Sequence, residues 1–137
     1  MSIARPVVAD THTFFWYTSN SSRLSECARE ALDATTDADF PIFVSAMSVV
    51  ELRYLVEKGT ISEAEFEVLV PELAEPDSPY EIAPLDGGIA MDVDQISRKH
   101  NADPFDRTIG ATAVTLGVPL VTCDRKLQKQ PALDTIW

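Results

Sequence analysis

The stretch HNADPFDRTIGATA, residues 100–113, holds two aspartates three positions apart, ahead of a run of small and apolar residues. Asp103 suits a helix N-cap, Pro104 suits the first helical position, and an acid at Asp106 is favoured near the positive end of the helix dipole. The pattern predicts a helix that begins here and ends at Gly117. The two carboxylates are explained either by helix capping alone or by capping together with a chemical task.

Short apolar runs alternate with longer helical patterns along the rest of the chain. Strands are predicted at RPVVAD (5–10), PIFVSAM (41–47), YEIAPL (80–85) and VPLVTCD (118–124), with DTIW (134–137) as a fifth, edge strand. Further helices are predicted at LSECAREALDAT (24–35), SVVELRYLVEKG (48–59), ISEAEFEVLVPEL (61–73) and GGIAMDVDQISRKH (87–100). Strands separated by helices need crossover connections, which are typical of parallel sheets. We therefore expect one α/β domain over residues 1–137, with a mostly parallel central sheet of four to five strands and helices on both faces.

The composition is that of a soluble globular domain. Of 137 residues, 45% are hydrophobic, and 11 basic against 22 acidic residues give a formal net charge of -11. This charge disfavours adhesion to nucleic acid or anionic membranes through the bulk field. We expect a cytoplasmic protein, because we find neither a signal-peptide pattern nor the roughly 18 apolar residues of a membrane span. Cys27 and Cys123 lack a CxxC spacing, so neither a zinc site nor a disulfide framework is predicted, and Cys123 is expected to be a small buried side chain.

Three acids fall near one edge of the predicted sheet, and Asp106 joins them if its helix begins at that same edge. Asp10 ends the first strand and Asp124 the fourth, Glu51 lies in the helix after the second strand, and Asp106 lies in the first turn of the helix before the fourth. In open parallel sheets, ligands bind beyond the carboxyl ends of the strands, near the point where the strand order reverses. Clustered carboxylates resist ionising together unless a positive group lies among them, and ligands that are all oxygens indicate Mg²⁺ or Mn²⁺.

Each acid also has a purely structural explanation. Asp10 is a good turn residue or cap for a helix in THTFFWY, Ser48 and Glu51 have the spacing of a capping box, and Asp124 suits an ordinary turn. The residues alone leave both interpretations open. The coincidence of four acids at one edge is what favours a metal site.

Four segments together resemble the motif regions of PIN-domain proteins, and specifically of the toxin nucleases of VapBC-type toxin-antitoxin pairs. They are VVADTHTFFWY, FVSAMSVVELRYL, ADPFDRTIGATA and LVTCDRKL, and with the intervening helical patterns they cover nearly the whole chain. The resemblance implies that the catalytic, metal-binding acids are Asp10, Glu51, Asp106 and Asp124, with Asp103 and Thr122 as accessory residues. It also implies Mg²⁺- or Mn²⁺-dependent endoribonuclease activity on structured RNA (tRNA-like or rRNA), leaving 5′-phosphate and 3′-hydroxyl ends, and a cognate antitoxin as partner.

Several neighbours of the acids have open roles. Arg107, Arg125 and Lys126 are candidates for contacts with RNA phosphates, or they are solvated surface charges. His12 is either a general base or, as we favour, a packing or hydrogen-bonding residue. The aromatics FFWY, residues 14–17, are expected in the core and on a helix face rather than in a base-stacking platform.

Three further expectations concern surfaces, packing and alternatives. The helical segment 49–70 carries more apolar residues than one buried face needs, so it is the predicted surface for the antitoxin and for a homodimer. Gly110 stands where the PIN-domain pattern more often has Ala, a departure that affects packing and touches none of the acids. A phosphoacceptor receiver domain is disfavoured, because the chain lacks an acid pair after its first strand and a Lys after its last. A noncatalytic PIN-like module that binds protein or RNA is the remaining alternative.

Overall fold

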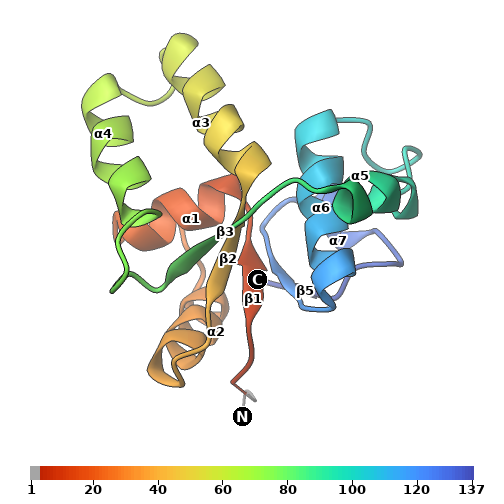
Figure 1. The fold of residues 1–137 in the computed structure, drawn as a ribbon, viewed down its shortest axis with the longest axis horizontal. Helices are drawn as coiled ribbons and strands as arrows, with labels where there is room; N and C mark the ends of the chain where they lie inside the picture. Colours follow the sequence, from red (N-terminus) through yellow and green to blue (C-terminus); the bar gives the residue numbers. More distant parts are fainter. Residues whose placement is uncertain (1–3) are drawn as a thin grey trace.

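A parallel sheet lies between two groups of helices in the computed structural model, which describes residues 4–137 (Figure 1). The strands of this part of the chain are β1 (Val7–Ala9), β2 (Ile42–Ser45), β3 (Tyr80–Ala83), β4 (Leu120–Val121) and β5 (Thr135–Ile136). The helices are α1 (Thr11–Thr18), α2 (Glu26–Asp37), α3 (Ala46–Glu57), α4 (Glu63–Glu72), α5 (Gly87–Asp92), the 3₁₀ helix η1 (Val93–Gln95), α6 (Pro104–Leu116) and α7 (Arg125–Gln128). All strand pairs are parallel, in the order β3-β2-β1-β4-β5. The predicted α/β class and the fifth, edge strand are confirmed.

The strand order reverses beside β1. From β1 the chain forms β2 and β3 on one side, and later adds β4 and β5 on the other. In the register of β1 with β4, Val8 pairs with Leu120 and Ala9 with Val121, so the carboxyl ends of the two strands lie together. The switch point of the sheet therefore lies where Asp10 leaves β1, which is where ligands bind in open parallel sheets.

The two faces of β1 pack against different helices. Val7 and Ala9 lie in a large core with side chains of α1 to α4, including Phe14 and Leu52. Val8 points to the opposite face and packs in a second core with side chains of α6 and α7. Figure 1 shows the same division, with α1 to α4 on the left of the sheet and α5 to α7 on the right. Because both faces are covered, β1 is apolar throughout.

Three helical segments differ from the prediction. Helix α3 begins at Ala46 with Ser45 as its cap, so the predicted capping box of Ser48 and Glu51 is wrong; Ser48 is buried inside the helix. The helix predicted over 87–100 ends early, at α5 and η1. The guanidinium of Arg107 binds the carbonyls of Val93 and Ile96, and with the buried contacts of the following loop it keeps residues 96–100 out of a helical conformation. The short helix α7 was not predicted, since four residues carry no periodic signal. As predicted, α6 ends at Gly117, whose φ of 68° is the left-handed conformation that favours glycine.

Within residues 4–137, the structure has no helix of the length and apolar character that a membrane crossing requires.

Candidate active site

The predicted acids meet in one pocket at the switch point. It has a volume of about 160 Å³ and is lined by Asp10, Thr11, His12, Glu51, Asp103, Asp106, Cys123 and Asp124. All four predicted core acids and the accessory Asp103 are therefore brought together from distant parts of the chain. A larger hollow of about 590 Å³ lies beside β3 and shares none of these residues. The acidic pocket is therefore distinguished by the side chains that line it and not by its volume.

Asp10 has a structural and a site role at once. It caps α1, because one of its carboxylate oxygens accepts a hydrogen bond of 2.9 Å from the backbone N–H of Thr13. Its other oxygen accepts from the hydroxyl of Thr122, a fully buried residue that follows β4. Burial raises the pKa of Asp10 against the effect of these hydrogen bonds. The capping explanation and the metal-site explanation therefore do not exclude each other.

Glu51 reaches the pocket from the second turn of α3. Its Oε1 accepts a hydrogen bond from the hydroxyl of Thr11, which also lies 3.0 Å from Oγ of Ser48. Partial burial raises the pKa of Glu51, and the charges of Asp103 and Asp10 add to the effect. Thr11 thus fixes one carboxylate oxygen of Glu51 to the beginning of α1.

Asp106 lies in the first turn of α6, which Asp103 caps. The Oδ1 of Asp103 accepts from the backbone N–H groups of Phe105 (2.8 Å) and Asp106 (3.2 Å). The side-chain amide of Asn101 donates to Oδ2 of Asp106 over 3.0 Å. Burial, and then the negative charges of Asp103, Asp124 and Glu51, raise the pKa of Asp106 to about 7. This carboxyl therefore keeps its proton to a higher pH than a solvent-exposed aspartate does.

Asp124 lies just beyond β4 and caps α7, accepting a hydrogen bond of 2.8 Å from the backbone N–H of Lys126. The backbone N–H of Asp124 donates to the hydroxyl oxygen of Thr122 over 3.0 Å. Because the same hydroxyl donates to Asp10, Thr122 joins the two acids. Thr122, the expected accessory residue, therefore contacts both of these acids.

The free carboxylate oxygens show what the pocket offers to a ligand. Four acids, Glu51, Asp103, Asp106 and Asp124, each have one carboxylate oxygen that accepts a hydrogen bond and one that accepts none from residues 4–137. In that same part of the chain no three His, Cys, Asp or Glu side chains are grouped closely enough to hold a cation by themselves. Oxygen donors that stand apart in a pocket without Lys or Arg fit a hard divalent ion that keeps several water ligands, as Mg²⁺ does.

The other predicted neighbours fall into different surroundings. His12 is exposed and lines the pocket, and its ring centroid lies 5.4 Å from that of Trp16, so both roles weighed for it stay open. Phe14 is in the core and the other aromatics of residues 14–17 are half-buried against it, as predicted. Cys123 is half-exposed and lines the pocket, so the expectation of a small buried side chain is wrong.

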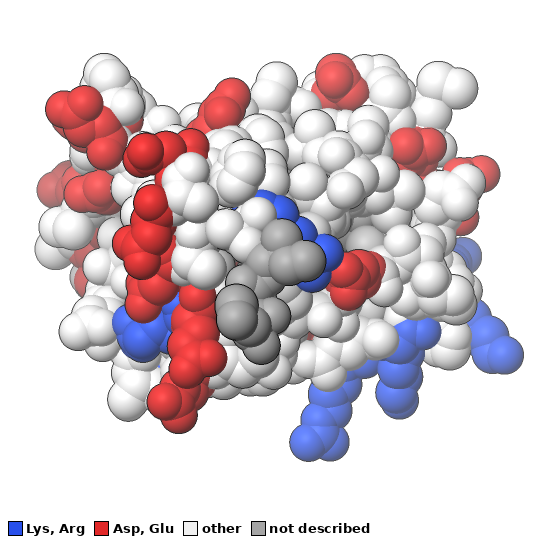
Figure 2. Space-filling model, turned by 90° about the horizontal axis from the view of Figure 1, so that it is seen from below, with Lys and Arg blue, Asp and Glu red and all other residues white. Residues whose placement is uncertain are grey.

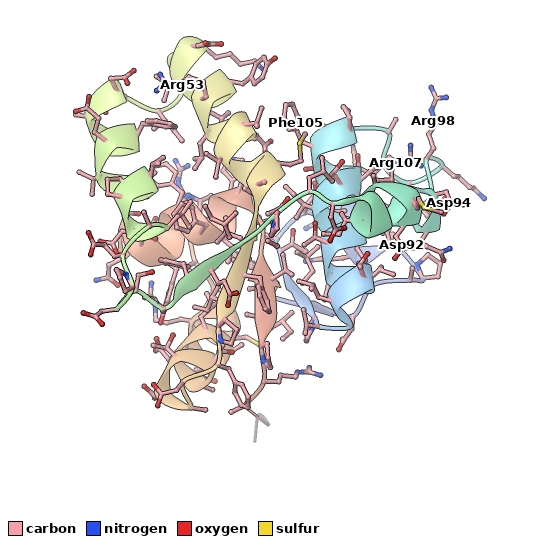
Figure 3. The ribbon with its side chains drawn as sticks, viewed as in Figure 1. Arg53, Asp92, Asp94, Arg98, Phe105 and Arg107 are labelled. Carbon is pink, nitrogen blue, oxygen red and sulfur yellow. The ribbon has the colours of Figure 1, made fainter. Side chains whose placement is uncertain are left out.

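The three cationic candidates differ in how they are engaged. The guanidinium of Arg107 donates to the backbone carbonyls of Ile96 (3.0 Å) and Val93 (3.3 Å), so it is directed toward η1, as Figure 3 shows. Arg125 and Lys126 are exposed on α7, next to Asp124. Sequence reasoning missed Thr11 and Asn101. Because Thr11 directly follows Asp10, its place in the pocket could have been predicted, whereas nothing in the sequence pairs Asn101 with Asp106.

The chain belongs to the PIN-domain family, whose pattern matches residues 7–133. Within that family it is VapC-type: it is 33% identical over 135 residues to Ribonuclease VapC22 of Mycobacterium tuberculosis, covering 96% of this chain and 98% of that relative. The family resemblance inferred from the four motif segments is thereby confirmed.

Solved VapBC complexes share the fold. VapBC2 from Rickettsia felis, bound to a DNA fragment from its promoter, matches with a TM-score of 0.70 at 17% identity, over 97% of this chain and 100% of that one. DNA-bound VapBC from Salmonella typhimurium matches with a TM-score of 0.69 at 22% identity, over 97% of both chains. At these identities the likeness concerns the fold alone.

Proposed function

We propose that this chain is a divalent-metal-dependent endoribonuclease that cleaves structured RNA, tRNA-like or rRNA, as the toxin of a toxin-antitoxin pair in the cytoplasm. The observation that carries the proposal is the convergence of Asp10, Glu51, Asp106 and Asp124 on one pocket at the switch point of the sheet. The name of the relative VapC22, a ribonuclease, supports the reaction class. The VapBC complexes of the same fold support the pairing with an antitoxin.

The acids of the pocket are the groups that would hold Mg²⁺ or Mn²⁺. The atoms that they offer to a metal are all carboxylate oxygens. A bound cation would also relieve the repulsion between their negative charges. The chemistry that a bound divalent ion supplies is activation of water and neutralisation of charge at the scissile phosphate. The chain's own contribution is to orient the acids through Thr122 and Thr11 and to leave further carboxylate oxygens free.

Local cations must bring RNA to this acidic protein. On the face shown in Figure 2, several Lys and Arg side chains project at the lower right, while acidic side chains are most crowded on the left. Arg125 and Lys126 are exposed beside Asp124, so we assign them the contacts with RNA phosphates. Arg107 is the weaker candidate, because its guanidinium already donates to two backbone carbonyls.

The antitoxin would bind the apolar surface around α4. A hollow of about 290 Å³ between α1 and α4 is lined mainly by apolar side chains, among them Phe15, Val68 and Leu69. Val50, Tyr54 and Val68 are also exposed on α3 and α4. Exposed apolar surface of this kind is typical of protein interfaces, and we extend the proposal to a homodimer through the same two helices.

The test is RNA cleavage by purified variants with and without Mg²⁺ or Mn²⁺. Asp10→Asn and Asp106→Asn should keep the fold and abolish cleavage, because each removes a ligand charge at nearly constant size. Asp86→Asn is the matched control, since Asp86 caps α5 away from the pocket and Asn caps equally well. Cleavage by the folded Asp10 or Asp106 variant at the wild-type rate would reject the site.

The same protein distinguishes the noncatalytic alternative. If calorimetry with millimolar Mg²⁺ and Mn²⁺ detects no binding and a pool of tRNA and rRNA stays intact, the chain is a PIN-like binding module and the proposed activity is wrong.

A further inference from the structure

We propose that Asn101 is a positioning residue that fixes the orientation of Asp106 in the pocket. The inference rests on the proposed function, in which Asp106 is a metal ligand. Asn101 lies in the loop between η1 and α6, outside the pocket lining, and it is only 3% exposed. An asparagine is rarely buried unless its amide is hydrogen-bonded on both sides.

Both ends of the Asn101 amide are used. Its Nδ2 donates to Oδ2 of Asp106 over 3.0 Å, and its Oδ1 accepts from the backbone N–H of Asp103 over 2.9 Å. The side chain thereby spans the N-cap of α6 and the carboxylate one turn further on. With Oδ2 held by Asn101, the remaining oxygen of Asp106, Oδ1, is the one left for a ligand.

The neutral amide suits this place better than a charged donor. Asp106 is surrounded by Asp103, Asp124 and Glu51, which raise its pKa. A Lys or Arg in place of Asn101 would neutralise Asp106 and compete with a cation, whereas an amide donates a hydrogen bond without adding charge. Asn101 therefore orients the carboxylate and leaves its charge for the metal.

The loop that carries Asn101 is itself anchored. Gln130, 2% exposed, accepts from the backbone N–H of Ser97 (2.7 Å) and donates to its carbonyl (2.8 Å). The guanidinium of Arg107 donates to the backbone carbonyls of Val93 and Ile96 in this segment. Because the backbone before Asn101 is fixed at several points, the amide sets the position of Asp106 and does not follow it.

The experiment compares Asn101→Leu and Asn101→Ala with Thr35→Val. Asn101 and Thr35 are matched, since each is a buried polar side chain with two hydrogen-bonding contacts, but the hydroxyl of Thr35 contacts only the backbone carbonyls of Arg5 and Ala31, whereas Asn101 touches a carboxylate of the pocket. Three quantities are measured on each folded protein: the thermal midpoint, the Kd for Mn²⁺ by calorimetry, and kcat and KM for RNA cleavage.

We expect both Asn101 variants to weaken Mn²⁺ binding or lower kcat by about 10- to 100-fold, as is typical when a partner of a metal ligand is removed. KM for RNA should change little. Thr35→Val should also lower the thermal midpoint, yet leave the Kd for Mn²⁺ near the wild-type value.

Two results would overturn the inference. One is wild-type Mn²⁺ affinity and kcat in both Asn101 variants; the other is an equal loss of affinity in Thr35→Val, which would give Asn101 a merely structural role. A wild-type protein that binds no Mn²⁺ would reject the proposed function itself, and that outcome is read from the wild type alone.

Discussion

The hydroxyl of Thr122 donates a hydrogen bond to Asp10, 112 positions earlier in the chain, and accepts one from the backbone N–H of Asp124. One buried hydroxyl therefore joins the acid that follows β1 to the acid that follows β4, across the switch point of the sheet. Neither strand alone could place both carboxylates in the pocket.

Thr122→Val should impair catalysis far more than Thr122→Ser. Valine keeps the shape of threonine but removes the hydroxyl, so Asp10 loses a hydrogen bond and its orientation. We expect a loss of about 10- to 100-fold in kcat and a loss of about 1–3 kcal/mol in the free energy of unfolding, because a buried acceptor is left unpaired. Cleavage assays and denaturant unfolding measure the two effects.

Thr112→Val is the control for that comparison. Thr112 is also buried, but its hydroxyl donates only to the backbone carbonyl of Thr108 within α6. Cleavage should stay at the wild-type rate in this variant. If it falls as far as in Thr122→Val, loss of a buried hydroxyl in general explains the effect, and Thr122 has no special role.

Mg²⁺ should raise the thermal midpoint more at pH 8 than at pH 5. Burial and neighbouring charges raise the pKa values of Asp10 and Glu51 and bring that of Asp106 to about 7, whereas in the unfolded chain such groups titrate near pH 4. Between about pH 4 and pH 7 the native state therefore binds more protons than the unfolded state, and its contribution to stability falls as the pH rises. A divalent cation substitutes for those protons and stabilises the native state by mass action.

Melting curves at pH 5, 6, 7 and 8, with Mg²⁺ or with KCl at equal ionic strength, check this prediction. Without metal, Asp106→Asn should reduce the fall of the thermal midpoint with rising pH, because the raised pKa of Asp106 no longer contributes to it. A wild-type midpoint without metal that rises steadily from pH 5 to pH 8 would contradict the prediction if Asp106→Asn removes part of that rise. If the variant keeps the whole rise, other groups cause it.

Val68→Lys should weaken antitoxin binding and leave RNA cleavage intact. Val68 is 67% exposed on α4 and lines the apolar hollow beside α1, so the substitution places a charge in the proposed interface without disturbing the core. Expression of the wild-type chain should slow bacterial growth, and co-expression of the small protein encoded beside it should restore growth. The Val68 variant should stay toxic under co-expression, whereas Glu51→Gln should be harmless alone.

Met91→Lys is the matched control for the interface. Met91 is 79% exposed on α5, away from the hollow. Rescue of growth should be as complete with this variant as with the wild type. Equal rescue of the Val68 variant would place the antitoxin elsewhere on the molecule.

Gly110→Ala should destabilise the protein although alanine favours helices. A Cβ at Gly110 would lie 3.0 Å from Cδ1 of Ile96, a fully buried side chain. Crowding a packed core costs more than the roughly 1 kcal/mol that alanine gains over glycine in a helix, so we expect a net loss of about 1 kcal/mol. Gly88→Ala in α5, where the added Cβ meets only ordinary contacts of 3.5 Å and beyond, should be neutral or stabilising in the same unfolding assay.

The elements with a repeating pattern were readable from the sequence. The cap at Asp103, the end of α6 at Gly117 and the apolar strands depend on neighbours within one turn or one strand, so local residue types specify them. The boundary of α3 was misread because Ser48 and Glu51 match a capping box, while Ser48 is in fact buried beside Thr11, 37 positions away. Helix α5 ends early for a similar reason, since its stop depends on the guanidinium of Arg107 in α6.

The sequence by itself determined which acids to consider, the alternation of strands and helices, and the resemblance to PIN-domain proteins, because residue types, spacing and period are local properties. Only the tertiary structure decided which oxygen of each acid is held and which is free, since the donors Thr11, Thr122 and Asn101 come from other segments. It also decided that the pKa of Asp106 is raised, because burial and the charges of Asp103, Asp124 and Glu51 act through space, and no spacing along the chain records those distances.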